Sequence, residues 1–254
     1  MTDAGHLVLD GIRKSFGGKV ALNGVTLALP KQTIAGLIGP NGSGKTTLIN
    51  CATGFLPLDG GTVSLEGKRL DHLSADRRAR AGLVRTFQIS RPFGDLSLVD
   101  NLVAGSEEGP TDSERTKAQD LLGLVGLQDV SHRLGRNLSY GQGRLLDLAR
   151  VLMLEPKVIL LDEPAAGVHP NVIERLKRLI VELNEQGTTF LIVEHNIQVI
   201  KELCSLVAVL HNGENIAKGS MDEVRNDPQV VEAYLGTGGA HRRPHRGNND
   251  VQSA

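Results

Sequence analysis

The sequence predicts an α/β fold whose core is a mostly parallel sheet with helices on both faces. Short apolar segments rich in β-branched residues alternate with amphipathic helical segments, which is typical of parallel sheets. One of these apolar segments leads through a glycine-rich loop into a helix. Strands joined by tight turns near the N-terminus and a helix-biased middle stretch add an antiparallel β subdomain and an inserted α-helical subdomain.

The first third of the chain is expected to consist of strands and turns. Gly17 and Gly18 provide a turn between the first two strands, and the strand that ends at Ile38 runs into the glycine-rich loop. A helix is expected after the loop, at residues 46–53. Apolar alternation predicts strands at residues 7–9, 19–22, 25–29, 33–38 and 62–65.

The chain changes character at roughly residues 90–150. Between about residues 95 and 136, Ala118, Leu121, Leu122 and Val125 recur at helical spacing, which predicts the inserted helical subdomain. Strand and helix then alternate again, with an amphipathic helix at 172–183. Asn212-Gly213 is a type I′ hairpin signature. Strands are expected at residues 158–161, 188–193, 206–210 and 215–218. Residues 1–236 are interpreted as one domain, and residues 237–254, with little to bury, as a disordered tail.

Composition excludes several classes of protein. In 254 residues the net charge is −1, aromatic residues make up 3% and tryptophan is absent, which argues against nucleic acid as a partner. Cys51 and Cys204 cannot form a disulfide framework and are interpreted as buried thiols in a reducing compartment. No apolar run approaches the ~20 residues of a membrane span, and the start does not resemble a signal peptide. The chain is therefore expected to be cytoplasmic and to reach a membrane only through a partner.

The loop GPNGSGKT at residues 39–46 matches the phosphate-binding template G-x-x-x-x-G-K-[ST]. Glycines let successive backbone N–H groups point at phosphate oxygens, and the helix that follows presents its positive end to the same anion. Lys45 is expected to reach the β- and γ-phosphates, and the Thr46 hydroxyl to coordinate Mg²⁺. A glycine-rich surface turn with a chance lysine is the alternative, and the strand and helix around the loop disfavour it. The predicted core is thus that of a P-loop NTPase.

Two acidic residues end the apolar strand of VILLDEP. Asp162 is placed at the strand tip, where ligands bind in open α/β sheets, and is suited to hold Mg²⁺ through water. Glu163 could polarise a water molecule for attack on the γ-phosphate. The alternative is that the pair only caps a following helix.

Taken together, the motifs resemble the ATP-binding subunit of ABC transporters to about residue 236. GPNGSGKT resembles the Walker A loop, VILLDEP the Walker B strand and LSYGQ the signature motif, with Tyr140 where glycine is commoner. RTFQ places Gln88 at the Q-loop, IVEHN places His195 at the switch histidine, and AAGVHP resembles the D-loop. The chain departs from the family pattern at Gly143 and Asn196, and its helical subdomain is shorter than in many members.

The resemblance implies that two cassettes face each other head to tail, with ATP and Mg²⁺ between the Walker A loop of one and the signature motif of the other. Gln88 would contact Mg²⁺ and the attacking water, His195 would hold the γ-phosphate, and Phe16 would stack on adenine. Each has a plainer alternative: a surface glutamine, a strand-end histidine and a core phenylalanine. The implied ATP-binding residues are Phe16, Gly39, Pro40, Asn41, Gly42, Ser43, Gly44, Lys45, Thr46 and Thr47 on one side, and Ser139, Gly141 and Gln142 on the other. Ser139 could equally be a helix N-cap, a role compatible with γ-phosphate binding.

RTFQ, PAAGVHP and the closing VEAYLG resemble the cytoplasmic ATPase of branched-chain amino acid importers. The implied partners are a second cassette, identical or more often a similar sibling, two membrane permeases on the inner face of the membrane and, indirectly, a solute-binding protein. Related cassettes for urea uptake and lipopolysaccharide export share parts of the pattern. A soluble ABC protein acting on ribosomes or DNA would usually carry two cassettes. A P-loop kinase would leave LSYGQ and His195 without a role.

Overall fold

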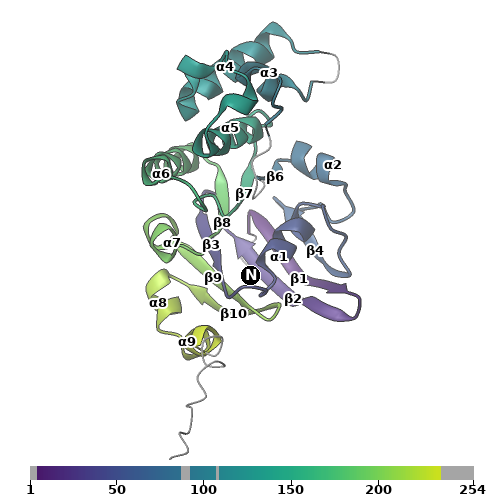
Figure 1. Ribbon diagram of the computed structural model, residues 1–254. Helices are drawn as coiled ribbons and strands as arrows, with labels where there is room; N and C mark the ends of the chain where they lie inside the picture. Colours follow the sequence, from purple (N-terminus) through teal and green to yellow (C-terminus); the bar gives the residue numbers. More distant parts are fainter. Residues whose placement is uncertain (1–4, 87–91, 107–108, 236–254) are drawn as a thin grey trace, which may run out of the picture.

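Two sheets form the framework of the computed structural model, which describes residues 5–86, 92–106 and 109–235 (Figure 1). A four-stranded antiparallel sheet has the order β2-β1-β4-β5, and a six-stranded sheet has the order β10-β9-β3-β8-β7-β6. In the larger sheet β10 runs antiparallel to β9, and the other neighbours pair in parallel. The strands are β1 (Leu7–Phe16), β2 (Lys19–Leu29), β3 (Ile34–Ile38), β4 (Gly60–Leu65), β5 (Lys68–Arg69), β6 (Leu83–Arg85), β7 (Val158–Asp162), β8 (Thr189–Val193), β9 (Leu206–His211) and β10 (Glu214–Gly219).

Helices cover both faces of the six-stranded sheet and gather at one end of the molecule, which confirms the predicted fold class (Figure 1). The helices are α1 (Lys45–Ala52), α2 (Ala75–Arg80), α3 (Leu98–Val103), α4 (Asp112–Val125), α5 (Tyr140–Leu152), α6 (Pro170–Glu185), α7 (Ile197–Leu203), α8 (Met221–Arg225) and α9 (Pro228–Leu235), with 3₁₀ turns at Gln128–Val130 and Gly135–Asn137.

The first two strands are longer than the sequence suggested. Residues 7–9 extend to Phe16, and the two segments expected at 19–22 and 25–29 are one continuous strand. The register between β1 and β2 shifts between Leu9 and Ile12 and again after Ile12. Such bulges let strands stay paired where the alternation of apolar residues is interrupted. The Gly17-Gly18 turn joins the two strands as predicted.

Two apolar cores lie on opposite faces of the larger sheet. Ile159 and Leu161 of β7 point into one core, and the alternating Val158 and Leu160 point into the other. This period of two places one core against α5, α6 and the helical end, and the other against α1 and the antiparallel sheet. A parallel sheet buried on both faces is held rigidly, so the loops at its strand ends start from fixed positions.

Helices α3, α4 and α5 form the helical end of the molecule (Figure 1). Helix α4 begins with a capping box between Thr111 and Glu114 and ends at Gly126, which has a left-handed conformation. Ala118, Leu122 and Val125 are buried as the helical spacing predicted, whereas Leu121 is only partly buried at the margin of the same core.

The C-terminal elements pack beside β9 and β10. The hairpin between these strands turns at Asn212 and Gly213, both with positive φ, as the dipeptide predicted. Across the described ranges, no helix is long and apolar enough to cross a membrane. The tail predicted to be disordered, residues 237–254, lies outside the described residues.

Candidate nucleotide site at the sheet edge

The carboxyl ends of three adjacent strands carry the predicted site. Strands β3, β8 and β7 are neighbours and parallel. The phosphate loop follows β3, and His195 follows β8. Asp162 is the last residue of β7, and Glu163 comes directly after it. The topology therefore brings together segments more than 100 residues apart, at the edge where open α/β sheets bind ligands.

Two glycines allow the phosphate loop its shape. Gly39 has φ +153° and Gly44 has φ +109°, both in the range that favours glycine. A Cβ at Gly39 would lie 2.0 Å from the backbone oxygen of Leu210, and one at Gly44 would lie 2.7 Å from that of Ala21. The loop is pressed against β9 and β2 so closely that any side chain at these positions would displace it.

Lys45 is wrapped by its own loop. Its Nζ donates hydrogen bonds to the backbone oxygens of Gly39 at 2.8 Å and Pro40 at 3.0 Å, and approaches the Ser43 hydroxyl at 3.5 Å. Burial lowers the pKa of Lys45, and the negative charges of Glu163 and Asp162 partly offset this effect. An ammonium so desolvated gains strongly from an anionic partner, and phosphate oxygens can replace the two carbonyls.

A pocket of about 330 Å³ opens between the phosphate loop and the antiparallel sheet. Phe16 and Val20 bring apolar surface to it and are 47% and 54% exposed, while Glu163 and His195 bring polar groups. Concave sites with apolar walls and a few polar groups are typical ligand sites. The lining residues are Phe16, Lys19, Val20, Ala21, Asn41, Gly42, Gly44, Lys45, Thr46, Thr47, Glu163 and His195.

Asp162 is fully buried at the tip of β7. Burial raises its pKa, and the neighbouring Arg85 guanidinium, whose Nη2 lies 3.3 Å from Oδ2, opposes that rise. The other carboxyl oxygen, Oδ1, is buried without a hydrogen-bond partner in the part of the chain that the structure describes. An oxygen of this kind suits a cation or a water molecule bound to one.

Glu163 has a left-handed backbone with φ +50°, which is uncommon for a residue other than glycine. Its N–H donates to the backbone oxygen of Val193 at 2.9 Å, and one carboxyl oxygen lies 3.1 Å from Nε2 of His195. The next helix, α6, starts at Pro170 and is capped by His169. The alternative that the acidic pair merely caps a helix is therefore wrong.

The signature segment lies in the first turn of α5, away from this pocket. The Ser139 hydroxyl accepts a hydrogen bond from the Gln142 N–H, and the Gln142 side chain accepts one from the Ser139 N–H. This capping box accounts for both side chains within the chain itself. A Cβ at Gly141 would lie 3.1 Å from Val172, so α5 and α6 pack closely there.

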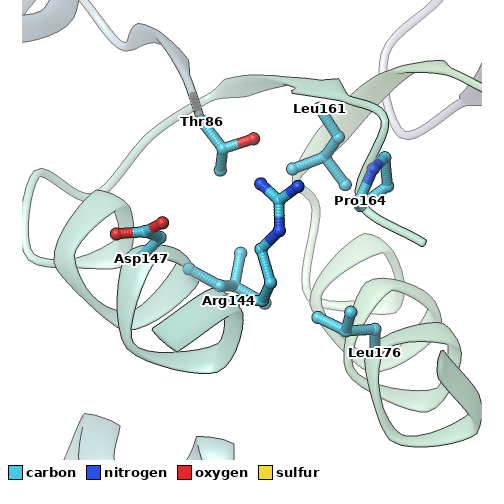
Figure 2. A pocket seen from close by; sticks show the side chains of 7 residues that line it. Thr86, Arg144, Asp147, Leu161, Pro164 and Leu176 are labelled. Atoms are coloured by element: carbon cyan, nitrogen blue, oxygen red, sulfur yellow. The ribbon is translucent and has the colours of Figure 1, made fainter. Parts of the chain in front are cut away.

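Arg144, one turn further along α5, points toward the end of β7. Figure 2 shows its guanidinium between Thr86 and Asp147 on one side and Leu161 and Pro164 on the other.

The Arg144 guanidinium also donates a hydrogen bond to the Tyr140 hydroxyl at 2.8 Å and lies 3.5 Å from the backbone oxygen of Glu163. The signature helix thus touches the strand end that carries the acidic pair.

Three residues at the site were not found from the sequence. Arg85 pairs with Asp162, and Glu194 accepts a hydrogen bond from the Ala165 N–H in the loop after β7. Burial raises the pKa of Tyr234 in α9, and a hydrogen bond with the backbone of Gly39 lowers it. All three stand inside motifs quoted from the sequence, Arg85 in RTFQ, Glu194 in IVEHN and Tyr234 in VEAYLG, but nothing in those motifs indicated a role for them. Gln88 lies outside the described residues.

Comparison with known proteins agrees with this geometry. Residues 22–166 match the ABC transporter family, and residues 214–240 match the branched-chain amino acid ATP-binding cassette transporter family. The chain belongs to the ABC transporter family of ATP-binding cassettes. It is therefore an ATP hydrolase of the ABC type, as the motifs predicted.

Two curated relatives are similar over nearly their whole length. The high-affinity branched-chain amino acid transport ATP-binding protein LivG of Escherichia coli strain K12 is 38% identical, with 91% of this chain and 97% of LivG covered. BraF of Pseudomonas aeruginosa has the same description and is 37% identical, with the same coverage. Among solved structures, the ADP conformation of MJ1267, an ATP-binding cassette of an ABC transporter, matches with a TM-score of 0.83 and 36% identity. That match covers 91% of this chain and 98% of MJ1267.

Proposed function

We propose that this chain is the ATP-binding and ATP-hydrolysing subunit of an ABC importer for branched-chain amino acids. The observation that carries the enzymatic part is the single pocket lined by the phosphate loop, Phe16, Glu163 and His195. The names of LivG and BraF support the solute class.

The proposal gives roles to the phosphate loop and to three side chains of the pocket, Phe16, Glu163 and His195. The loop N–H groups and Lys45 bind the β- and γ-phosphates, and Phe16 packs on the adenine ring. Glu163 accepts the proton of the attacking water, and His195, 3.1 Å away, orients the Glu163 carboxylate and contacts the γ-phosphate. Gln88 is proposed to contact the same water.

The residues present also fit Mg²⁺. Asp162 offers a buried unpartnered oxygen, Thr46 a hydroxyl in the pocket, and Gln88 is the third proposed contact. Within the described ranges there is no group of three His, Cys, Asp or Glu that could hold a metal. Mg²⁺ commonly binds through one or two protein groups together with substrate phosphates. When bound, Mg²⁺ would neutralise developing charge on the phosphates.

A second cassette completes the site in this proposal. Ser139, Gly141 and Gln142 lie at the start of α5, which Figure 1 places well away from α1 and the phosphate loop. The N-terminal end of α5 is a suitable anion site for the γ-phosphate bound by a facing cassette. The partner is an identical chain or, as we favour, a similar sibling.

The membrane permeases are proposed to dock on a groove between the helical end and the larger sheet. Phe93 and Leu154 line it and are 48% and 50% exposed, and the ion pair of Arg150 with Asp147 adds polar groups. The proposal therefore includes two permeases and an indirect link to a solute-binding protein. It also places the chain in the cytoplasm, at the inner face of the membrane.

The catalytic assignment is tested with Glu163→Gln. Glu155 offers a matched control, because it is also a glutamate with φ +50° and lies outside the pocket. Glu163→Gln should lower kcat for ATP hydrolysis by about 10²- to 10⁴-fold and keep ATP affinity. In ATP and Mg²⁺ it should elute as a dimer in gel filtration, whereas Glu155→Gln should behave as wild type. Normal turnover by a monomeric Glu163→Gln protein would remove Glu163 as the base.

The solute is tested with the whole transporter, because the cassette does not contact it. The chain is co-expressed with the permeases encoded beside it and placed in proteoliposomes with the solute-binding protein. Leucine, isoleucine or valine should stimulate ATP hydrolysis and accumulate in the vesicles. Stimulation by urea instead, or association with lipopolysaccharide exporters, would change the solute assigned to the transporter. It would not affect the assignment of ATP hydrolysis to this chain.

A further inference from the structure

One buried carboxylate joins the two loops that carry the proposed catalytic groups. Glu194 directly follows β8 and is 3% exposed. One of its oxygens, Oε1, accepts a hydrogen bond from the Ala165 N–H at 2.6 Å. The other, Oε2, accepts from the N–H groups of His195 at 3.1 Å and Asn196 at 3.4 Å. Glu194 therefore fastens the loop after β7 to the loop after β8, with one oxygen for each.

These loops leave the sheet side by side. Asp162 of β7 is in register with Val193 of β8, so the chain continues from neighbouring positions into Glu163 and Glu194. The Glu163 N–H still bonds to the Val193 oxygen, but the left-handed backbone at Glu163 then turns the chain out of the sheet. The pairing of β7 with β8 ends at that point, and the Glu194 carboxylate joins the two loops instead.

This link between the two loops affects the distance between the side chains of Glu163 and His195. Ala165 stands two residues after Glu163, and His195 stands one residue after Glu194. The distance of 3.1 Å between Oε1 of Glu163 and Nε2 of His195 joins side chains from the two fastened loops. Because a carboxylate accepting N–H groups in a buried site makes strong, directional hydrogen bonds, it can hold this distance closely.

We propose that Glu194 is a positioning residue that sets the separation of Glu163 and His195 by joining the loops after β7 and β8. The inference rests on the function proposed above, since it matters for catalysis only if those two side chains act on the nucleotide. It adds a residue that touches neither the nucleotide nor the water.

The test begins with Glu194→Gln in the full chain. Glutamine keeps the size of the side chain but replaces one acceptor oxygen with an NH₂ donor, so one of the two loops must lose its hydrogen bond. We expect kcat for ATP hydrolysis to fall about 10- to 100-fold, because small displacements of catalytic groups have effects of this order. The Kd for ATP should stay within about twofold, since the phosphate loop is untouched.

A matched control is Glu223→Gln. Glu223 also accepts a backbone N–H, that of Ser220 at 2.7 Å, but lies in α8 away from the pocket. The Glu223→Gln variant should keep kcat within about twofold of wild type, even if its urea midpoint falls as much as that of Glu194→Gln.

A double-mutant comparison separates positioning from general damage. In a His195→Ala background there is no histidine left to position, so Glu194→Gln should lower kcat by less than about threefold further. A full, multiplicative loss in that background would overturn the inference. So would an unchanged kcat for a folded Glu194→Gln protein. If Glu194→Gln does not fold, Glu194→Asp is tested in its place. Aspartate keeps both acceptor oxygens but is one methylene shorter, so it cannot hold both loops at the same separation. A wild-type kcat for Glu194→Asp would overturn the inference.

Failure of this inference can be told from failure of the proposed function. If Glu163→Gln abolishes hydrolysis and Glu194→Gln does not affect it, only the positioning role is lost. If Glu163→Gln hydrolyses ATP normally, the assignment of the base is wrong and the positioning role falls with it.

Discussion

Replacing Arg85 with methionine should destabilise the nucleotide-free protein far more than a comparable surface change. The side chains of Arg85 and Asp162 are 7% and 1% exposed, and Nη2 lies 3.3 Å from Oδ2. Burial lowers the pKa of Arg85 and raises that of Asp162, and the charge of each partner opposes the shift of the other. Arg85→Met keeps the aliphatic stem and removes only the charge and its hydrogen bonds.

The magnitude follows from the difference in burial. Removing one partner of a buried ion pair costs about 3–5 kcal/mol, because the other charge is left uncompensated. An exposed pair contributes about 0–1 kcal/mol. Arg115 and Asp100 provide the comparison, with a similar N–O distance of 3.2 Å but side chains that are 46% and 42% exposed. We therefore expect Arg85→Met to lower the free energy of unfolding by about 3 kcal/mol or more, and Arg115→Met by less than about 1 kcal/mol.

The assay is urea unfolding followed by far-UV circular dichroism, since the chain has no tryptophan to report unfolding by fluorescence. Asp162→Asn is then added to Arg85→Met to remove the orphaned charge. The double variant should recover part of the loss, giving a coupling of about 1–3 kcal/mol. Equal losses in Arg85→Met and Arg115→Met, or strictly additive effects in the double variant, would refute the argument from burial.

Three further predictions follow from the site and the core. Lys45→Ala should abolish ATP binding measured by calorimetry, because it removes the buried ammonium; unchanged affinity would remove the phosphate-cradle assignment. Gly44→Ala should also lose ATP binding and destabilise the protein by about 1–3 kcal/mol, since φ is +109° and the new Cβ would clash with the Ala21 oxygen. Burial raises the pKa of Cys51 to about 11 and that of Cys204 to about 12, which keeps both thiols protonated at neutral pH. Compared with a free thiol at pH 8, iodoacetamide should label Cys51 about 100-fold and Cys204 about 1,000-fold more slowly. Labelling should become faster as the pH rises toward those pKa values and should be immediate in urea; rapid labelling of the folded chain at pH 8 would contradict this.

The parts of the site that depend on short-range sequence were predictable. The phosphate loop is one example, because its glycines are required by the local backbone, and a lysine and a threonine at fixed offsets complete it. The buried strand before Asp162 is another, since four apolar residues followed by two acids indicate a strand that ends at a ligand edge. For Ser139 the sequence left capping and phosphate binding open, and the structure shows the cap within the chain.

Other features depend on tertiary neighbours and could not be predicted. Strand β6 has three residues, too few for a periodic signal, and exists because it pairs with β7. Its last residue, Arg85, is an ordinary basic residue until this pairing brings it to Asp162. Glu194 likewise looks like a polar residue at a strand end, and only the register of β7 and β8 gives it Ala165 as a partner.

The charged groups of the site have partners within the chain. Lys45 is held by loop carbonyls, Asp162 by Arg85, and Glu163 by His195. For Lys45 and Glu163, binding a nucleotide is therefore an exchange of partners, whereas Oδ1 of Asp162 has no hydrogen bond to give up within the described residues. The measured affinity is the difference between the new contacts and those given up, so it will be smaller than a count of phosphate contacts suggests.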